Sequence, residues 1–233
     1  MTQASNIPVV TIDGPSGSGK GTLACLLAKA LGWHILDSGV LYRILALFSL
    51  QSRVSPTDEE SLVTLTKKMP VEFIITDELS TKILLDGEDI SKVIRDEQIG
   101  NLASKISAFQ SVRSALMGKQ RYFRQLPGLV TDGRDMGTLV FPDAEVKLFL
   151  VASPEERARR RYNQLKNKGI SVTLARIVDE IEQRDRRDSE RAVAPLRPAE
   201  DSIMIDSSGL TIEDVFLKAL DIIQRRLKIG SND

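Results

Sequence analysis

Cysteine, histidine and net charge are what this sequence has least of. One cysteine, Cys25, and one histidine, His34, occur in 233 residues, and 32 Lys and Arg balance 32 Asp and Glu. A lone cysteine excludes an internal disulfide framework and a cysteine-based zinc site, and it suits a reducing compartment. Zero net charge argues against a protein that coats nucleic acid over its whole surface, although it is compatible with a local basic patch.

Long apolar segments are missing as well. No run approaches the ~20 apolar residues that span a bilayer, and the first residues lack the basic and apolar stretches of a secretory signal. With 42% hydrophobic and 27% charged residues, the composition is that of a globular chain. We therefore expect a soluble, cytoplasmic protein without a membrane partner. Its length suits one α/β domain, or one such domain with an insertion.

Short apolar runs alternate with helical patterns along most of the chain. The runs predict five buried strands, at 8–13, 34–36, 129–132, 146–151 and 202–206. Helical patterns include 20–31, 40–51 and 211 to about 227. This alternation predicts a parallel sheet with helices on both faces.

The stretch at 70–105 breaks the alternation. Two strand-like runs, 71–75 and 82–85, are separated only by a polar loop at 76–81. Strands this close, without a crossover helix, must be antiparallel if they pair. The stretch is therefore expected to be a small insertion; the alternative is an edge hairpin of the main sheet.

A glycine-rich loop lies between the first strand and the first helix. It reads Gly14, Pro15, Ser16, Gly17, Ser18, Gly19, Lys20, Gly21 and Thr22. Glycines let successive backbone N–H groups turn toward a phosphate, and a helix N-terminus adds partial positive charge. Lys20 is expected to reach the β- and γ-phosphates and a hydroxyl to face Mg²⁺. Because Gly21 stands where Ser or Thr is usual, Thr22 is the candidate hydroxyl for the metal.

Charged residues follow two other strands at the edge where an open α/β sheet binds its ligands. After the second strand, Arg43 lies about one turn into the helix that follows Asp37 and Ser38. After the third, Asp132, Arg134 and Asp135 stand among glycines. Arginine can fork onto a phosphate. Asp132 is a second candidate for Mg²⁺.

The segment 153–197 is basic in a neutral protein. It holds twelve Lys and Arg against eight Asp and Glu, a net charge of +4. On a helix, Arg184, Asp188 and Arg191 share one face. An enzyme that moves a phosphoryl group between two anions needs such cations on both sides of the γ-phosphate.

Three other classes of protein fit part of this pattern. A GTPase switch would share the glycine-rich loop, but the sequence has no Asn/Thr-Lys-x-Asp guanine-recognition motif. A regulator that binds nucleic acid could use the arginine-rich helix. A shikimate kinase, or another kinase with a small acceptor, would leave Asp135 and the insertion unexplained.

Taken together, these motifs resemble the bacterial-type cytidylate (CMP/dCMP) kinases, within the nucleoside monophosphate kinase superfamily. The resemblance runs from the glycine-rich loop through Leu36–Gly39 and Asp132–Thr138 to Arg184–Pro195. It implies a three-layer α/β P-loop fold with a five-stranded parallel sheet, a small antiparallel-β and helical insertion, and a helical lid. The core would comprise 1–69, 106–152 and 173–233, the monophosphate-binding insertion 70–105, and the lid 153–172. The resemblance also implies ATP and CMP or dCMP as substrates, with no nucleic-acid partner, and we expect a monomer.

The resemblance also implies a role for each site residue. Arg43, Arg134 and Arg191 would hold the acceptor's phosphate, with Lys20, Arg134 and Arg191 as the catalytic set. Ser104, Arg113 and Asp135 would recognise the base, Arg184 and Asp188 the sugar, and Ser38 would line the acceptor site. Arg157, Arg160 and Arg161 belong to the lid, and Arg157 and Arg161 are expected at the ATP. The chemistry of cytosine supports the base assignment, because Asp135 can accept from its N4 amino group.

Overall fold

The computed structural model describes residues 7–76, 81–167, 169 and 171–229. The polar lead before the first strand falls almost wholly outside these residues. So do positions 77–80 of the loop expected between the two antiparallel strands.

The predicted parallel sheet is present. It contains β1 (Val9–Asp13), β2 (His34–Asp37), β6 (Leu129–Gly133), β7 (Val146–Val151) and β8 (Ile203–Asp206). The order across the sheet is β2-β6-β1-β7-β8, and every neighbouring pair is parallel. All five residues of β1 are buried, as expected for a central strand covered on both faces.

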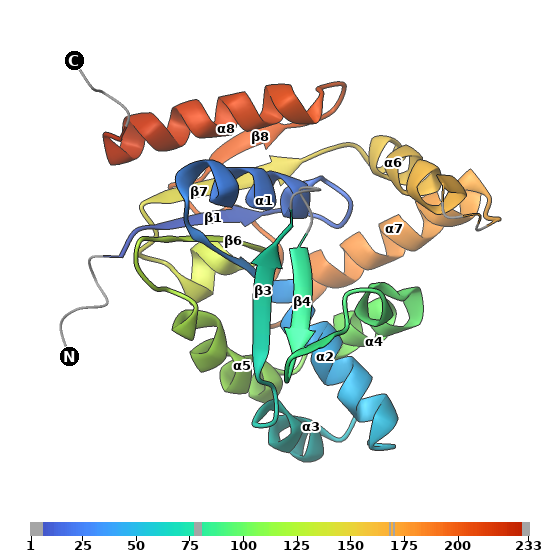
Figure 1. Cartoon of the computed structure of the whole chain (residues 1–233). Coiled ribbons are helices and arrows are strands. Elements are labelled where there is room, and N and C mark those ends of the chain that lie inside the picture. Colours follow the sequence, from blue (N-terminus) through green and yellow to red (C-terminus); the bar gives the residue numbers. More distant parts are fainter. Residues whose placement is uncertain (1–6, 77–80, 168, 170, 230–233) are drawn as a thin grey trace.

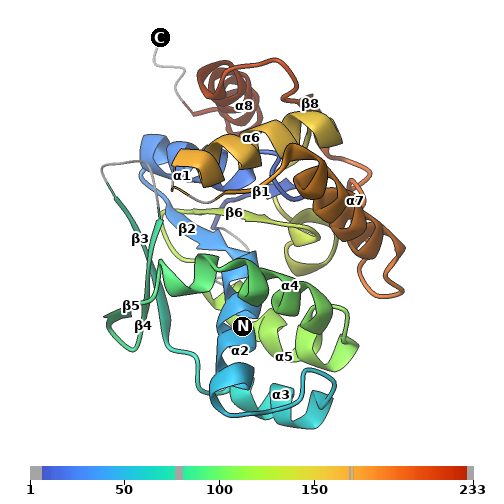
Figure 2. The same cartoon turned by 90° about the vertical axis from the view of Figure 1, so that its right-hand side faces the viewer.

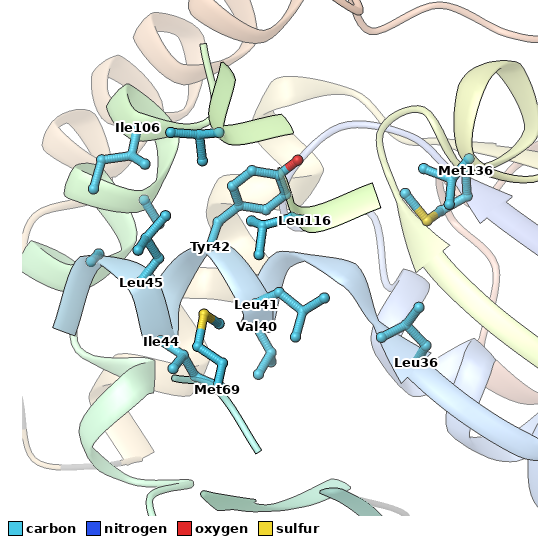
Figure 3. Packing of buried hydrophobic residues seen from close by; sticks show 14 of the residues in the cluster. Leu36, Val40, Leu41, Tyr42, Ile44, Leu45, Met69, Ile106, Leu116 and Met136 are labelled. Atoms are coloured by element: carbon cyan, nitrogen blue, oxygen red, sulfur yellow. The ribbon is translucent and has the colours of Figure 1, made fainter. Parts of the chain in front are cut away.

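Helices cover both faces of this sheet (Figure 1). On one face α1 (Lys20–Leu31) and α8 (Ile212–Leu227) pack on alternate strand residues such as Val10, Ile12 and Val130. On the other face α2 (Ser38–Gln51) and α5 (Gln110–Tyr122) cover Val9 and Leu129. Figure 3 shows this second core around α2, where Leu41, Tyr42 and Leu45 project among side chains of other elements. No described helix is long and apolar enough to cross a membrane.

Within the stretch at 70–105, residues 71–89 form a separate antiparallel sheet, so the predicted antiparallel pairing is confirmed. It consists of β3 (Val71–Ile75), β4 (Thr81–Leu85) and β5 (Glu88–Asp89). The alternative, an edge hairpin of the main sheet, is wrong. The 3₁₀ turn η2 (Val93–Arg95) and helix α4 (Glu97–Ile106) follow β5. Between α2 and β3 lies α3 (Glu59–Thr66).

Two long helices project from the sheet as a hairpin (Figure 2). They are α6 (Pro154–Asn167) and α7 (Leu174–Glu190), and they share a small apolar core of Ala158, Leu165, Ile177 and Ile181. In Figure 2, α6 and α7 lie side by side above α4 and α5, and α7 contacts α4. The α/β architecture expected from the sequence is confirmed, and the hairpin lies beside the carboxyl ends of the central strands.

Candidate active site

The phosphate loop, residues 14–22, takes a shape that only glycine allows at its bends. Gly14, Gly17 and Gly19 have φ angles of 148°, 80° and 97°. A Cβ on Gly14 would lie 2.1 Å from the carbonyl oxygen of Leu150. No side chain of the described residues caps α1. The first N–H groups of α1 can therefore serve an anion.

Lys20 is buried beneath this loop. Its Nζ donates to the carbonyl oxygen of Pro15 at 2.7 Å. Burial, and after it the charge of Arg134, lower the Lys20 pKa to about 7, against the opposing effect of the Asp132 and Asp13 carboxylates. The anionic phosphates of a nucleotide would favour the ammonium form of Lys20 and raise its pKa again.

A pocket lies close to Lys20, between α2, α4, α5, the end of β6 and the end of α7. Five arginines and four aspartates line it together with small and polar residues. The arginines are Arg43, Arg113, Arg134, Arg184 and Arg191, and the aspartates are Asp37, Asp132, Asp135 and Asp188. We call it the acceptor pocket. Its charge suits a ligand that is anionic at one end and polar at the other.

Two ion pairs organise the walls of the pocket. Arg113 pairs with Asp135 and also donates to the carbonyl oxygen of Ser107 at 3.0 Å. Arg134 donates from Nε to Asp188 at 2.8 Å, and the pairing holds the Asp188 pKa below its usual value despite burial. Charged hydrogen bonds of this kind fix both partners in orientation.

Arg43 is held by the insertion. It donates from Nη1 to the carbonyl oxygens of Ile94 at 2.7 Å and Asp96 at 3.2 Å. Gly100 of α4 makes room for this guanidinium: a Cβ there would lie 2.8 Å from Arg43 Nη2. The insertion therefore sets the position of an arginine that belongs to α2.

Unsatisfied polar atoms gather in the acceptor pocket. Of seven buried side-chain N or O atoms without a hydrogen-bond partner in the described part of the chain, four belong to its lining residues. They are Ser104 Oγ, Asp132 Oδ1, Arg184 Nε and one terminal nitrogen of Arg191. Burial and the neighbouring Arg134 lower the Arg184 pKa to about 10. Because leaving such groups unpaired is costly, they indicate a polar ligand.

Comparison with known proteins connects this pocket with a family. The family model for cytidylate kinase matches residues 10–225. A cytidylate kinase of Aeromonas salmonicida is 56% identical over 94% of this chain and 95% of its own. Those of Klebsiella pneumoniae and Enterobacter sp. are each 54% identical, over 97% and 99% of this chain and 99% and 100% of their own. The chain belongs to the cytidylate kinase family. The family and the class of enzyme expected from the sequence are thereby confirmed.

The cytidylate kinase fold brings the predicted acceptor residues together. All nine line the acceptor pocket: Ser38, Arg43, Ser104, Arg113, Arg134, Asp135, Arg184, Asp188 and Arg191. They come from the helices α2, α4, α5 and α7, from the residue after α7 and from the two residues after β6, so no single motif contains them. The role of each remains a prediction.

The predicted helical stripe at the end of α7 is wrong in one respect. Arg184 and Asp188 lie on the helix, but α7 ends at Glu190, and Arg191 has extended backbone angles. Its Nε donates to the carbonyl oxygen of Ala194, whose φ is 51°. The turn, rather than helical spacing, brings Arg191 to the pocket.

The three arginines expected in a lid lie in different environments. Arg157 is buried against the phosphate loop and paired with Asp185, and Arg160 donates to the carbonyl oxygens of Ser18 at 3.3 Å and Ser207 at 2.6 Å. Arg161 is half-buried, and its charge adds to the burial that lowers the pKa of Arg43. Direct contact of Arg157 and Arg161 with ATP stays a prediction. In this structure Arg157 is already engaged by protein acceptors.

Sequence reasoning did not assign three further residues of the site. Tyr42 lies under Arg113, whose guanidinium carbon is 5.7 Å from the ring centroid. Asp37 caps α2 by accepting from the Val40 N–H at 3.2 Å and also lines the pocket. Asp13 accepts from the N–H groups of Met136 and Gly137 at 2.9 and 2.8 Å, and burial raises its pKa to about 6. Asp13 and Asp37 are the last residues of β1 and β2, and a search for acidic residues at strand ends could have identified both.

The candidates for Mg²⁺ fit the ion's chemistry. Asp132 has one carboxylate oxygen without a protein partner among the described residues, and burial raises its pKa well above the usual value. Thr22 is exposed beside the phosphate loop. The described residues contain no group of three or more His, Cys, Asp or Glu side chains that could hold a metal. Mg²⁺ needs no such cage, because it binds through one or two protein oxygens, waters and nucleotide phosphates.

Proposed function

We propose that the protein transfers the γ-phosphoryl group of ATP to CMP or dCMP and releases ADP and CDP or dCDP. The observation that carries the proposal is the gathering of four unsatisfied polar atoms and five arginines in one pocket close to Lys20 of the phosphate loop. Lys20 links the two halves, because Arg134 and Asp132 of the acceptor pocket lie close enough to shift its pKa. Donor and acceptor phosphates would meet at this point.

The proposed mechanism needs alignment and charge neutralisation. The attacking oxygen belongs to the acceptor's phosphate and is already ionised at neutral pH, so the reaction requires no general base. The backbone N–H groups of residues 14–22 and Lys20 would hold the β- and γ-phosphates of ATP. Arg43, Arg134 and Arg191 would orient the acceptor's phosphate and stabilise the transferring group.

Magnesium would contribute on the ATP side. Asp132, through water, and Thr22 are the residues proposed to hold it, and the bound ion would neutralise negative charge on the phosphates. A bound cation would favour the carboxylate form of Asp132, whose pKa burial raises in the free protein.

Recognition of cytosine would rest on Arg113, Asp135 and Ser104. The Arg113–Asp135 pair would offer a carboxylate to the N4 amino group, and the guanidinium would offer donors to N3 and O2. Ser104 Oγ lacks a partner among the described residues and supplies a further donor. Uracil would place a carbonyl against the carboxylate, so discrimination of up to ~10⁴-fold is expected. Arg184 and Asp188 would contact the sugar.

An ADP-release assay tests the proposal. Purified protein would be given Mg-ATP with CMP, dCMP, UMP, AMP or shikimate in separate reactions, and turnover is expected with CMP and dCMP. Turnover with UMP or AMP at a similar rate would retain the kinase but reject the cytosine assignment. Turnover independent of any acceptor would reject the proposal. A monomeric, cytoplasmic protein stays a prediction.

A further inference from the structure

The carbonyl oxygens of the phosphate loop have partners of their own. A loop that directs its N–H groups inward to a phosphate turns carbonyl groups outward, and buried carbonyls require hydrogen bonds. Pro15 O accepts from Lys20 Nζ at 2.7 Å and from Ser18 Oγ at 3.0 Å. Ser16 O accepts from Arg157 Nη1 at 3.0 Å. Ser18 O accepts from Arg160 Nη1 and Ser207 Oγ, each at 3.3 Å.

Arg157 contacts the loop through both its stem and its guanidinium. Its side chain is 3% exposed, and a Cβ on Gly17 would lie 3.3 Å from Arg157 Cβ. Besides Ser16 O, the guanidinium donates from Nε to Ala152 O at 3.0 Å. The remaining bonds go to both carboxylate oxygens of Asp185, one of them at 3.0 Å. The Arg157 guanidinium is therefore held by backbone carbonyls on one side and by the Asp185 carboxylate on the other.

The Asp185 carboxylate, which accepts from the Arg157 guanidinium, comes from a different helix. It lies on α7 directly after Arg184, which lines the acceptor pocket. Because successive helix residues are turned by about 100°, α7 directs Arg184 to the pocket and Asp185 to Arg157. A bidentate carboxylate restricts the guanidinium far more than one carbonyl would.

We propose that Asp185 is a positioning residue for ATP: acting through Arg157, it holds the phosphate loop in its phosphate-binding shape. The inference rests on the proposed function only in taking ATP as the ligand of this loop. Asp185 itself would contact neither substrate. Without the carboxylate, Arg157 could leave Ser16 O, and the loop would have to be ordered by the nucleotide at a cost in affinity.

The test compares Asp185→Asn with Asp179→Asn, the same substitution at an exposed site of the same helix. Asp185→Asn is expected to raise the ATP KM, and the Kd for ATP measured by calorimetry, about tenfold, the effect of one charge-assisted hydrogen bond. The CMP KM and the preference for CMP over UMP should stay within about twofold, as should every constant of Asp179→Asn.

A second variant keeps the test decisive if the first is poorly folded. Arg157→Lys retains the charge but not the fork, and its effect on ATP should be similar. Because both residues act through one contact, the double variant should be no weaker for ATP than the weaker single variant. Equal losses for ATP and CMP together with a lowered Tm would instead indicate a merely structural role and overturn the proposal. So would an ATP Kd equal to that of Asp179→Asn.

Failure of the proposed function would look different. If the wild-type protein binds ATP without CMP-dependent turnover, the reaction is rejected, and the ATP Kd values of the variants still decide the role of Asp185.

Discussion

The phosphate loop and the acceptor pocket are both built for anions, but from different parts of the chain. The loop uses backbone N–H groups from one continuous segment, residues 14–22, and its carbonyls accept from Lys20, Arg157 and Arg160. The pocket uses side chains from separate elements and retains unpartnered atoms on Ser104, Arg184 and Arg191. A backbone site can be complete before its ligand arrives. A side-chain site with buried arginines and unpartnered polar atoms is completed only by a ligand that pairs with them.

The difference has an electrostatic reason. Peptide dipoles at a helix N-terminus attract phosphate without the repulsion that grouped cations suffer. In the pocket, burial and mutual repulsion lower the pKa of Arg43, Arg184 and Arg191. Each aspartate there offsets part of this cost, as the Arg134–Asp188 pair does. The acceptor's phosphate would supply the remaining negative charge.

The largest expected effect lies where the two regions meet. Lys20→Ala removes the one side-chain cation of the phosphate loop, and we expect kcat to fall by about 10³-fold or more. The fold should survive, as judged by circular dichroism, because the alanine leaves no charge to bury. Near-normal kcat in the ADP-release assay would remove Lys20 from the mechanism.

The second effect concerns the pocket alone. Asp135→Asn replaces an acceptor for the cytosine N4 amino group with an amide that can also donate, and the CMP-over-UMP preference should fall by about 10²-fold or more. The ATP KM should change little. An unchanged ratio of kcat/KM for CMP and UMP would refute the base assignment.

A smaller effect separates the shape of the pocket from its charge. Gly100→Ala would press a methyl group against the Arg43 guanidinium, and kcat/KM for CMP should fall about tenfold through KM. Gly118→Ala is the matched control, because no atom lies within 4 Å of a Cβ at this exposed position of α5. It should leave activity unchanged and raise the free energy of unfolding by about 0.5–1 kcal/mol. Equal activities for the two variants would break the link between Gly100 and Arg43.

The smallest expected effect is the uptake of a proton by Lys20 of the phosphate loop when ATP binds. With the Lys20 pKa at about 7 in the free protein, most Lys20 is neutral at pH 8. Phosphate favours the ammonium form, so binding of ATP at pH 8 without metal should take up a proton, up to about one per site. Calorimetry in two buffers of different ionisation enthalpy measures this number. Lys20→Gln should abolish the uptake; if the uptake persists in this variant, another group takes up the proton.

Much of the site could be predicted from the sequence, because several of its parts are local. The glycine spacing at 14–22 determines a backbone shape by sterics alone, and the apolar runs of the five strands determine a parallel sheet. The end of α7 was harder to predict, since helical spacing extended the helix through Arg191, whereas the chain turns at that residue. The partner of Arg157 was not predictable either, because Asp185 is 28 residues away on another helix.

The sequence by itself determined that this protein has a phosphate loop on an α/β sheet, and its motifs indicated the cytidylate kinase family. Both depend on short-range geometry and on residue order. The tertiary structure decided which charges face one another: that Arg113 meets Asp135, that Arg134 meets Asp188, and that Arg43 lies under Gly100. These partners come from elements far apart in the chain. Burial and mutual repulsion, which set their pKa values, exist only once the core has brought those elements together.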